Sequence, residues 1–437
     1  MEFKQYPSYK KSGVEWLGGV PEHWVGSKFK YIFQEKQHTK NMNLPFGAIS
    51  FGSVVYKEDK ANLTDELKEN YQEVLQGEFL VNPLNLNYDL KSLRTALSKI
   101  DVVVSSGYFV LKLKNNTFNK RYLEYLLYIF DIRKMKTLGA GIRQTLTFRD
   151  MAVCDVAIPS ACEQTQIASF LDYETFRIDN LIAKQEKLIE LLEEQRKSII
   201  SHAVTKGLNP NAPMKDSGVE WLGEVPEHWE VFQLKSAIKG WRNGKWGNEP
   251  AAENNICCVR VADFDRTKGV INTTKLTYRN YHGENISECI LDENSILIER
   301  SGGGEKQLVG ATVVNTLKQT AVCSNFISLL NINPNRVNIF FLQKCFENLY
   351  TRKVNEKSIK QTSGIQNLDL KQYLQNNIAY PSLDEQKSIV SYLDAECKKI
   401  DLLVDKQYQL IRKLKNYRTS IISHAVTGKI DVREFGT

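Results

Sequence analysis

The sequence predicts an α+β fold in which two globular units alternate with two long helices packed antiparallel. Three observations lead to this prediction. The segment 12–24, SGVEWLGGVPEHW, returns as SGVEWLGEVPEHW at 217–229. The segment 158–207 returns without a gap at 380–429, and between these repeated segments the two halves are almost unrelated. An internal repeat of this kind fixes the architecture into which every local motif must fit.

The two variable segments, residues 25–157 and 230–379, differ in length as well as in sequence. The offset between copies is 205 residues in the first pair and 222 in the second, so the second variable segment is 17 residues longer. Similar repeated segments around dissimilar inserts suggest one architecture that presents two different recognition units. Gene duplication followed by drift is the alternative, but drift alone would also have blurred the repeated segments.

Composition excludes several classes of protein. With 437 residues the chain has room for two to four domains. It contains neither an apolar leader nor a run of about 20 apolar residues, so we expect a cytoplasmic protein. The eight cysteines form no CxxC pair and no zinc-type cluster, which favours reduced thiols and no metal. Most of the net charge of +7 lies in the parts of the chain that differ, where a polyanion would bind.

The second repeated segment predicts a long helix in each copy. Residues 160–205 and 382–427 contain neither glycine nor proline. Each run begins with a predicted capping box and ends before a glycine: Ser160 with Glu163 and Gly207 in the first copy, Ser382 with Glu385 and Gly428 in the second.

Apolar residues recur at 3-4 spacing within both runs, which is typical of a coiled-coil seam. The predicted seam holds Leu171, Glu174, Ile178, Leu181, Gln185, Leu188, Leu192, Gln195, Ile199 and His202, and in the second copy Leu393, Glu396, Ile400, Leu403, Gln407, Leu410, Leu414, Tyr417, Ile421 and His424. A helix of about 40 residues spans roughly 60 Å. We expect the globular units at opposite ends of this antiparallel pair, related by a pseudo-twofold axis.

Catalytic interpretations of the repeated motifs are weak. The tetrad 384–387 resembles the end of a nuclease ExK motif, but its counterpart 162–165 lacks the aspartate and the lysine. Two units with different specificities should not share their reading residues, so the tryptophans of both copies, Trp16, Trp24, Trp221 and Trp229, are expected in the core. There is no tetrapeptide of the DPPY or NPPF kind and no GxxxxGK[ST], so neither base methylation nor ATP use is expected of this chain alone.

The chain resembles the specificity subunit of type I restriction-modification systems. The matching residues are the opening SGVEWLGxVPEHW, GIRQTLTF at 141–148 with GIQNLDL at 364–370, the IPSxxEQ and YPSxxEQ helix starts, the SIISHAVT helix ends, and VRVADFDRTKGVI at 259–271. The resemblance covers essentially the whole chain. It implies a noncatalytic subunit with two target-recognition domains, each reading one half of an interrupted DNA sequence, and helices that set the unread spacer.

The resemblance also implies partners and their cofactors. Two modification subunits that bind S-adenosylmethionine and methylate adenine would dock on the chain, and restriction subunits that translocate with ATP would join them. No cofactor is expected in this chain, and S-adenosylmethionine, ATP and Mg²⁺ would belong to the partners. An assembly scaffold whose variable segments bind two different proteins, without sequence-specific DNA binding, is the competing hypothesis.

These inferences give a predicted division of the chain and a set of candidate DNA-binding residues. The predicted domains are target-recognition domain 1 at 1–158, helix 1 at 159–206, a linker at 207–214, target-recognition domain 2 at 215–380, helix 2 at 381–428 and a tail at 429–437. Candidate residues lie in polar, basic loops that differ between the halves, where Arg and Lys suit guanine and Asn and Gln suit adenine. They are Lys36, His38, Lys40, Asn85, Asn87, Tyr88, Arg94, Arg143, Gln144 and Thr145 in the first half, and Arg242, Lys245, Trp246, Arg300, Ser301, Lys306, Gln307, Gln366 and Asn367 in the second.

Overall fold

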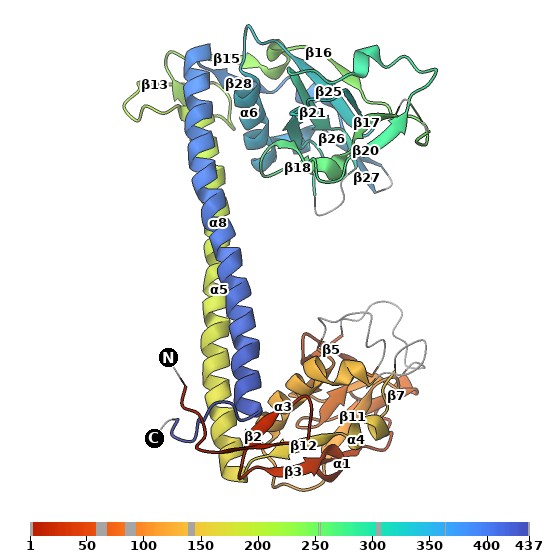
Figure 1. The fold of residues 1–437 in the computed structure, drawn as a ribbon. Helices are drawn as coiled ribbons and strands as arrows, with labels where there is room; N and C mark the ends of the chain where they lie inside the picture. Colours follow the sequence, from red (N-terminus) through yellow and green to blue (C-terminus); the bar gives the residue numbers. More distant parts are fainter. Residues whose placement is uncertain are drawn as a thin grey trace. The chain divides into compact units, whose positions relative to one another are not determined.

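The computed structural model describes residues 3–57, 68–83, 93–138, 145–251, 253, 255–302, 307–362 and 364–435. The chain divides into two compact units: unit 1 is Met1–Glu186 with Gln409–Thr437, and unit 2 is Lys187–Tyr408. The long helices α5 (Ala161–Lys206) and α8 (Leu383–Val426) each contribute residues to both units (Figure 1). Both helices begin and end within one to two residues of the predicted runs.

Unit 1 is built on small antiparallel sheets. The largest among the described residues has the strand order β4-β11-β8-β9, from Phe33–Glu35, Phe109–Leu113, Phe79–Val81 and Thr95–Leu97. The others pair β1 (Tyr9–Lys11) with β2 (Gly19–Pro21), β3 (Val25–Lys28) with β12 (Asp155–Ile158), β5 (Gly47–Ser50) with β6 (Ser53–Tyr56), and β7 (Tyr71–Val74) with β10 (Val102–Ser105). The α-helices among the described residues of this variable segment are α1 (Phe29–Ile32), α3 (Lys120–Arg133) and α4 (Phe148–Ala152).

Unit 2 has a different internal design. Its largest described sheet runs β16-β25-β21-β23-β19-β18, from Ile238–Asn243, Ile327–Ile332, Ser295–Glu299, Thr312–Val314, Val270–Ile271 and Phe264–Asp265. Smaller sheets contain β20-β17-β24 (Thr277–Asn280, Asn255–Val259, Ala321–Cys323), β22-β27-β26 (Ser301–Gly302, Ile365–Leu368, Ile359–Thr362), β15-β28 (Glu230–Gln233, Asn377–Tyr380) and β13-β14 (Met214–Asp216, Glu224–Pro226). Its shorter helices are α6 (Ile339–Thr351) and α7 (Leu370–Tyr373).

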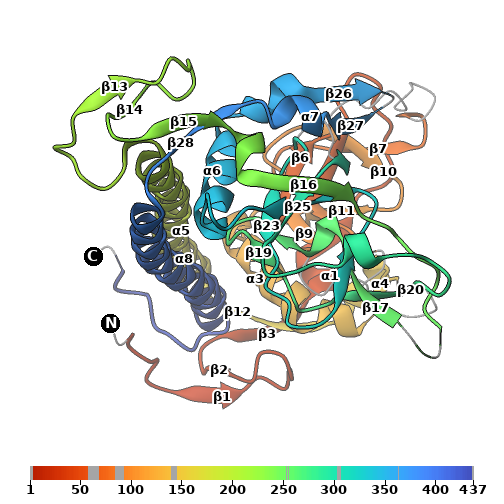
Figure 2. The ribbon, with the colours of Figure 1, turned by 90° about the horizontal axis from the view of Figure 1, so that it is seen from above.

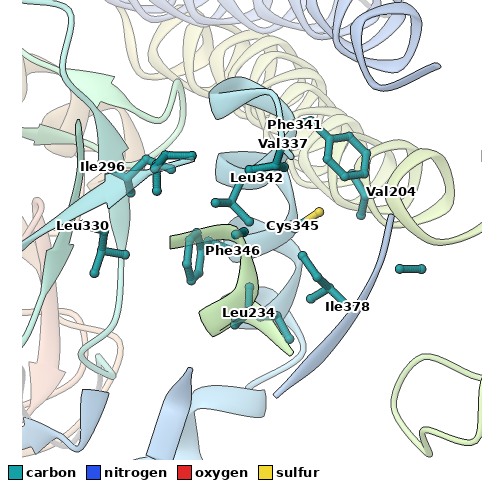
Figure 3. Close-up of a cluster of buried hydrophobic side chains, with 14 of the residues drawn as sticks. Val204, Leu234, Ile296, Leu330, Val337, Phe341, Leu342, Cys345, Phe346 and Ile378 are labelled. Atoms are coloured by element: carbon teal, nitrogen blue, oxygen red, sulfur yellow. The ribbon is translucent and has the colours of Figure 1, made fainter. Parts of the chain in front are cut away.

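The core of unit 2 joins the variable segment to the long helices. Helix α6 lies between the large sheet and the end of α5, so that Phe341 faces Val204 while Phe346 lies toward Leu234 (Figure 3). These four side chains are at most 2% exposed. Burying each such side chain contributes about 1.5–3 kcal/mol. The long helices are therefore part of the core and not appendages to it.

Within each unit, α5 and α8 lie side by side and antiparallel (Figures 1 and 2). In unit 1, Arg418 donates to both carboxylate oxygens of Asp179 at 2.9 and 3.2 Å. In unit 2, Arg196 pairs with Asp401, and the side chain of Arg196 is only 8% exposed. The predicted antiparallel helix pair is confirmed.

The predicted seam is wrong from its middle to its end, where more than half of its members are exposed: Leu181, Leu188, Gln195 and His202 in α5, and Leu403, Leu410, Tyr417 and His424 in α8. Leu181 and Leu188 are 37% and 39% exposed, whereas Ile182 and Ile189 are 8% and 6% exposed. A helix with 3.6 residues per turn drifts about 20° per heptad against a strict 3.5-residue repeat, so the buried stripe moves on by one residue. Gln185 and Gln407, predicted as buried polar seam residues, are half-buried.

Candidate nucleic-acid interface

The start of α5 holds a buried cluster around one carboxylate. Glu163 accepts hydrogen bonds from the indole N–H of Trp24 at 3.0 Å and from the hydroxyl of Tyr6 at 2.6 Å. Its other oxygen lies 2.8 Å from Nε2 of His23. Burial, and then the bond to Glu163, raise the pKa of the Tyr6 phenol. Trp24 is fully buried, so Glu163 satisfies a donor that has no access to water.

Unit 2 repeats this cluster around Glu385. The carboxylate accepts from the indole N–H of Trp229 at 3.0 Å and lies 2.9 Å from Nε2 of His228. The predicted capping boxes are therefore only half formed. The hydroxyl of Ser160 accepts from the N–H of Glu163 at 3.3 Å, but the Glu163 side chain is turned to Trp24 and does not return to the cap.

The glutamine after each glutamate fastens the shorter helix of the same unit. Gln164 accepts from the N–H of Asn119 at 2.9 Å, and Asn119 caps α3 through the N–H of Tyr122. In unit 2, Gln386 accepts from the N–H of Asn338 at 2.7 Å, and Asn338 caps α6. The EQ pair is thus a structural anchor in both copies.

The far ends of α3 and α6 are fastened in matching ways. Arg133 donates to the carbonyl of Trp16 and to the hydroxyl of Ser423 on α8. Arg352 donates to the carbonyl of Trp221 at 2.8 Å and to the hydroxyl of Ser201 on α5 at 2.9 Å. Each unit therefore combines the start of one long helix with the end of the other. Trp24 and Trp229 are fully buried and Trp16 is 8% exposed, as expected of core residues, whereas Trp221 is only partly buried and packs against the core of unit 2.

Two candidate residues of unit 1 do not suit a DNA surface. The ammonium of Lys36 lies 2.8 Å from Glu73 and 2.9 Å from Glu78, and its side chain is 6% exposed. Arg94 is 7% exposed. Both side chains would have to leave buried positions to reach a phosphate, so we leave them out of the interface. His38 and Lys40 are exposed and Thr145 is half-buried. Asn85, Asn87, Tyr88, Arg143 and Gln144 lie outside the described residues.

Several candidates of unit 2 lie near one another, although Ser301 itself is only 8% exposed. Ser301 on β22 donates to the amide oxygen of Asn367 on β27 at 2.6 Å, and Arg300 precedes Ser301 on the chain. Trp246 and Ser301 line a single recess. Arg242 and Lys245 lie on the stretch that leads to Trp246; they bond Glu288 and the carbonyl of Asn285, respectively.

The remaining described candidates of unit 2, Gln307 and Gln366, do not belong to this group. Gln307 is exposed but lines a different recess, next to α5. Lys306 lies outside the described residues. Gln366 is 4% exposed and accepts from the N–H of Val309 at 3.1 Å, so it supports the fold and is a poor phosphate contact.

Sequence reasoning missed some exposed aromatic side chains. Phe51 forms the tip of the β5–β6 hairpin; it is 96% exposed and has a φ of +47°. An exposed, bulky residue in the left-handed region is unusual and is a candidate for function. Phe326 in unit 2 is 47% exposed and lines the recess that contains Trp246. An aromatic residue beside a turn-favouring one, Gly52 for Phe51 and Asn325 for Phe326, was the available signal.

The long helices expose equivalent leucines. In unit 1 these are Leu181 and Leu410, and in unit 2 Leu188 and Leu403, each 37–43% exposed. Among the described helices, none is long and apolar enough to cross a membrane.

Comparison with known proteins gives the class. The family model described as the type I restriction modification DNA specificity domain matches twice, at residues 22–194 and 226–412. The MjaVIII specificity subunit of Methanocaldococcus jannaschii is 24% identical over 439 residues, which are 97% of each chain. The EcoKI specificity subunit of Escherichia coli is 23% identical over 212 residues, covering 48% of this chain and 44% of that one.

A solved structure supports the fold. It comes from a study of complex assembly and conformational transition in a type I restriction-modification system, and it matches with a TM-score of 0.64 at 16% identity, covering 93% of this chain and 98% of that one. The chain belongs to the type I restriction-modification DNA specificity family. It is a specificity subunit with two target-recognition domains, and the members of this family are noncatalytic DNA-recognition subunits.

Proposed function

We propose that each target-recognition domain reads one half of a bipartite DNA site, and that the two long helices set the unread spacer between the halves. The observation that carries this proposal is the contrast between units. Glu163 and Glu385 hold equivalent tryptophans through the same bonds, while the sheets mounted on these anchors differ in order and size. Two independent specificities on one subunit require recognition domains that are attached to the helices in the same way but differ in their sheets and loops.

The domain division at 1–158 and 215–380 belongs to this proposal. The half-sites would lie about one helical turn, roughly 34 Å, apart on one face of the duplex. The proposed interface uses His38, Lys40 and Thr145 in the first domain. In the second it uses Arg242, Lys245, Trp246, Arg300 and Asn367; Ser301 is left out because it is buried, and Gln307 because it lines the separate recess next to α5.

The test uses the complex assembled with its modification subunits and sequences the methylated adenines of host DNA. Wild type should give one two-part motif. Exchanging residues 1–155 for the equivalent segment of another specificity subunit should change one half of that motif only. A change in both halves would refute the independence of the domains.

Salt dependence separates this proposal from the scaffold alternative. Each phosphate gripped by a cation gives a slope of about −0.9 in log affinity against log salt. The proposed interface should therefore lose affinity steeply between 50 and 200 mM salt. A flat response without sequence preference would favour an assembly scaffold that binds two proteins.

We also propose that two modification subunits, which would carry S-adenosylmethionine, dock on the exposed leucines of α5 and α8. Restriction subunits that use ATP and Mg²⁺ would join the same complex. Leu181 and Leu403 occupy equivalent places in the two copies, which suits two like partners. Replacing either leucine by glutamate should reduce the bound modification subunits from two towards one in native mass spectrometry. Lys184→Glu, on an exposed polar position of α5, is the control. Full occupancy in both leucine variants would refute this docking surface.

A further inference from the structure

The β5–β6 hairpin of unit 1 carries an aromatic side chain at its tip (β5 in Figure 1). Ser50 pairs with Ser53, so Phe51 and Gly52 form a two-residue loop in which both φ angles are positive, +47° and +76°. Such loops normally hold Asn, Asp or Gly, because a bulky side chain is strained at positive φ. Phe51 is nevertheless 96% exposed, so its ring adds almost nothing to the core that could offset this strain.

The root of the same hairpin is fixed in the core of unit 1. Val54 is 8% exposed and packs in one cluster with Val102 and Val104 of β10. Gly47 lies so close to β10 that a Cβ built there would be 2.6 Å from the Val102 side chain. The tip is therefore held on a supported arm, and a prepositioned side chain loses little conformational entropy on binding.

Two lysines lie at the root of the hairpin. Lys57, which is exposed, follows β6 directly, and its N–H donates to the carbonyl of Phe46 at 2.9 Å. The ammonium of Lys68 lies 5.2 Å from the centre of the Phe46 ring. A strand of four residues extends about 13 Å, whereas the grooves of B-DNA are about 7.5–8.5 Å deep. Cations at the root can therefore meet phosphates while the tip reaches the stacked bases.

The position of the hairpin in the chain favours DNA over a protein as its binding partner. Phe51 lies in the variable segment 25–157 and within the first matched DNA specificity domain, 22–194. Two like modification subunits need surfaces that both copies provide, and the second half of the chain does not repeat the hairpin sequence. A feature present in only one half suits a DNA half-site, since the half-sites differ between the domains.

We propose that Phe51 is a wedge that inserts between two adjacent base pairs of the duplex bound by the first target-recognition domain and kinks the DNA at that step. Apolar side chains inserted in this way partly unstack the step and bend the duplex by about 20–90°. The aromatic ring then covers a base face that unstacking exposes. The proposal rests on the proposed DNA-reading function and adds a residue that deforms the site.

The first experiment measures the bend of a duplex that carries the two-part motif, by energy transfer between dyes at its ends, in the complex assembled with modification subunits. Phe51→Gly removes the ring and suits the positive φ, so the hairpin should still fold. Tyr56→Ala is the matched control, because Tyr56 is a 58% exposed aromatic residue of the same hairpin away from its tip. Phe51→Gly should reduce the bend by about 20° or more and the affinity about 10-fold, whereas Tyr56→Ala should keep the wild-type bend.

The second experiment changes the DNA and places a single nick at each successive base step of the first half-site. A nick removes one backbone connection and so lowers the cost of a kink at that step. Wild type should therefore bind more tightly when the nick lies at the wedge step, and Phe51→Gly should not. A step deformed by the modification subunits would give both proteins the same gain, so only the difference between them marks the wedge.

Equal bends for wild type and Phe51→Gly, or the same nick profile for both, would overturn the wedge. Fewer bound modification subunits with Phe51→Gly and an unchanged DNA bend would also overturn it and assign the ring to a protein contact. The absence of any two-part motif among the adenines methylated by the wild-type complex would instead overturn the proposed function itself.

Discussion

The two glutamate clusters predict unequal losses of stability on mutation. Replacing Glu163 by alanine leaves two buried donors unpaired, the indole of Trp24 and the hydroxyl of Tyr6, which are 0% and 3% exposed. Each unpaired buried donor costs about 1–3 kcal/mol, so we expect a loss of about 4 kcal/mol. Glu385→Ala leaves only the indole of Trp229 unpaired and should cost about 2 kcal/mol.

Hydrogen–deuterium exchange read by mass spectrometry is the suitable assay, because a multidomain chain does not unfold as a single two-state system. Glu163→Ala should accelerate exchange at the start of α5 in unit 1, and Glu385→Ala at the start of α8 in unit 2. Glu163→Gln retains an acceptor oxygen and should lie between wild type and the alanine variant. Equal effects of the two alanine variants, or none from Glu163→Ala, would refute the assignment of these carboxylates as acceptors for buried donors.

Three further substitutions test other parts of the structure. Burial raises the pKa of Asp131 to about 6 from an ordinary 3.8, so stability is lost as pH rises between these values. Asp131→Asn should therefore be more stable than wild type by up to about 3 kcal/mol at pH 8 and equally stable at pH 4, which amide hydrogen exchange of α3 compared with wild type at each pH would show; an equal gain at both pH values would contradict this cause. Phe51→Asn should raise stability by about 1 kcal/mol, since asparagine tolerates a positive φ, while DNA affinity falls if Phe51 touches the duplex. Gly428→Ala places a Cβ 2.2 Å from Pro21 and should lower the thermal midpoint more than Gly13→Ala, which has a similar φ but open space; equal losses would exclude the clash.

The sequence predicted the long helices because their signals are local. Capping residues, a glycine-free run and a terminal glycine are all within one element, and the helix bounds follow from them. The position of the buried stripe was not predicted. The angular difference between a 3.6-residue helix and a 3.5-residue repeat accumulates along the helix, so that Ile182 is buried in place of Leu181.

Candidate binding residues were harder to predict because a cation's availability depends on partners far away in the sequence. Lys36 is neutralised by Glu73 and Glu78, which lie on and next to other strands. Nothing at positions 34–40 indicates this pairing. Residue type and local polarity therefore predicted a region, whereas burial and pairing decide which side chains remain available.

One long-range feature was nevertheless accessible in the sequence. Trp24 and Glu163 are far apart in the chain, yet both recur in the second half, as Trp229 and Glu385. Residues retained in both copies while their surroundings differ are candidates for contact with one another, and here the indole bonds are 3.0 Å in each unit.

Each unit contains the end of the long helix that begins in the other unit, and this explains why the anchor residues recur in both copies. In unit 1 Arg133 bonds Ser423 at the end of α8, and in unit 2 Arg352 bonds Ser201 at the end of α5. Each recognition domain therefore contacts two long helices. One is the helix that follows the domain directly in the chain, and the other is the end of the long helix of the other copy. A change in the anchor of one domain would need a matching change at the end of the opposite helix. The sheets of the two variable segments differ in strand order and size although these anchors are alike. Different sheets can therefore be attached to the same anchor residues. The anchor residues themselves are kept similar in both copies because, in each unit, they must contact the end of the second long helix.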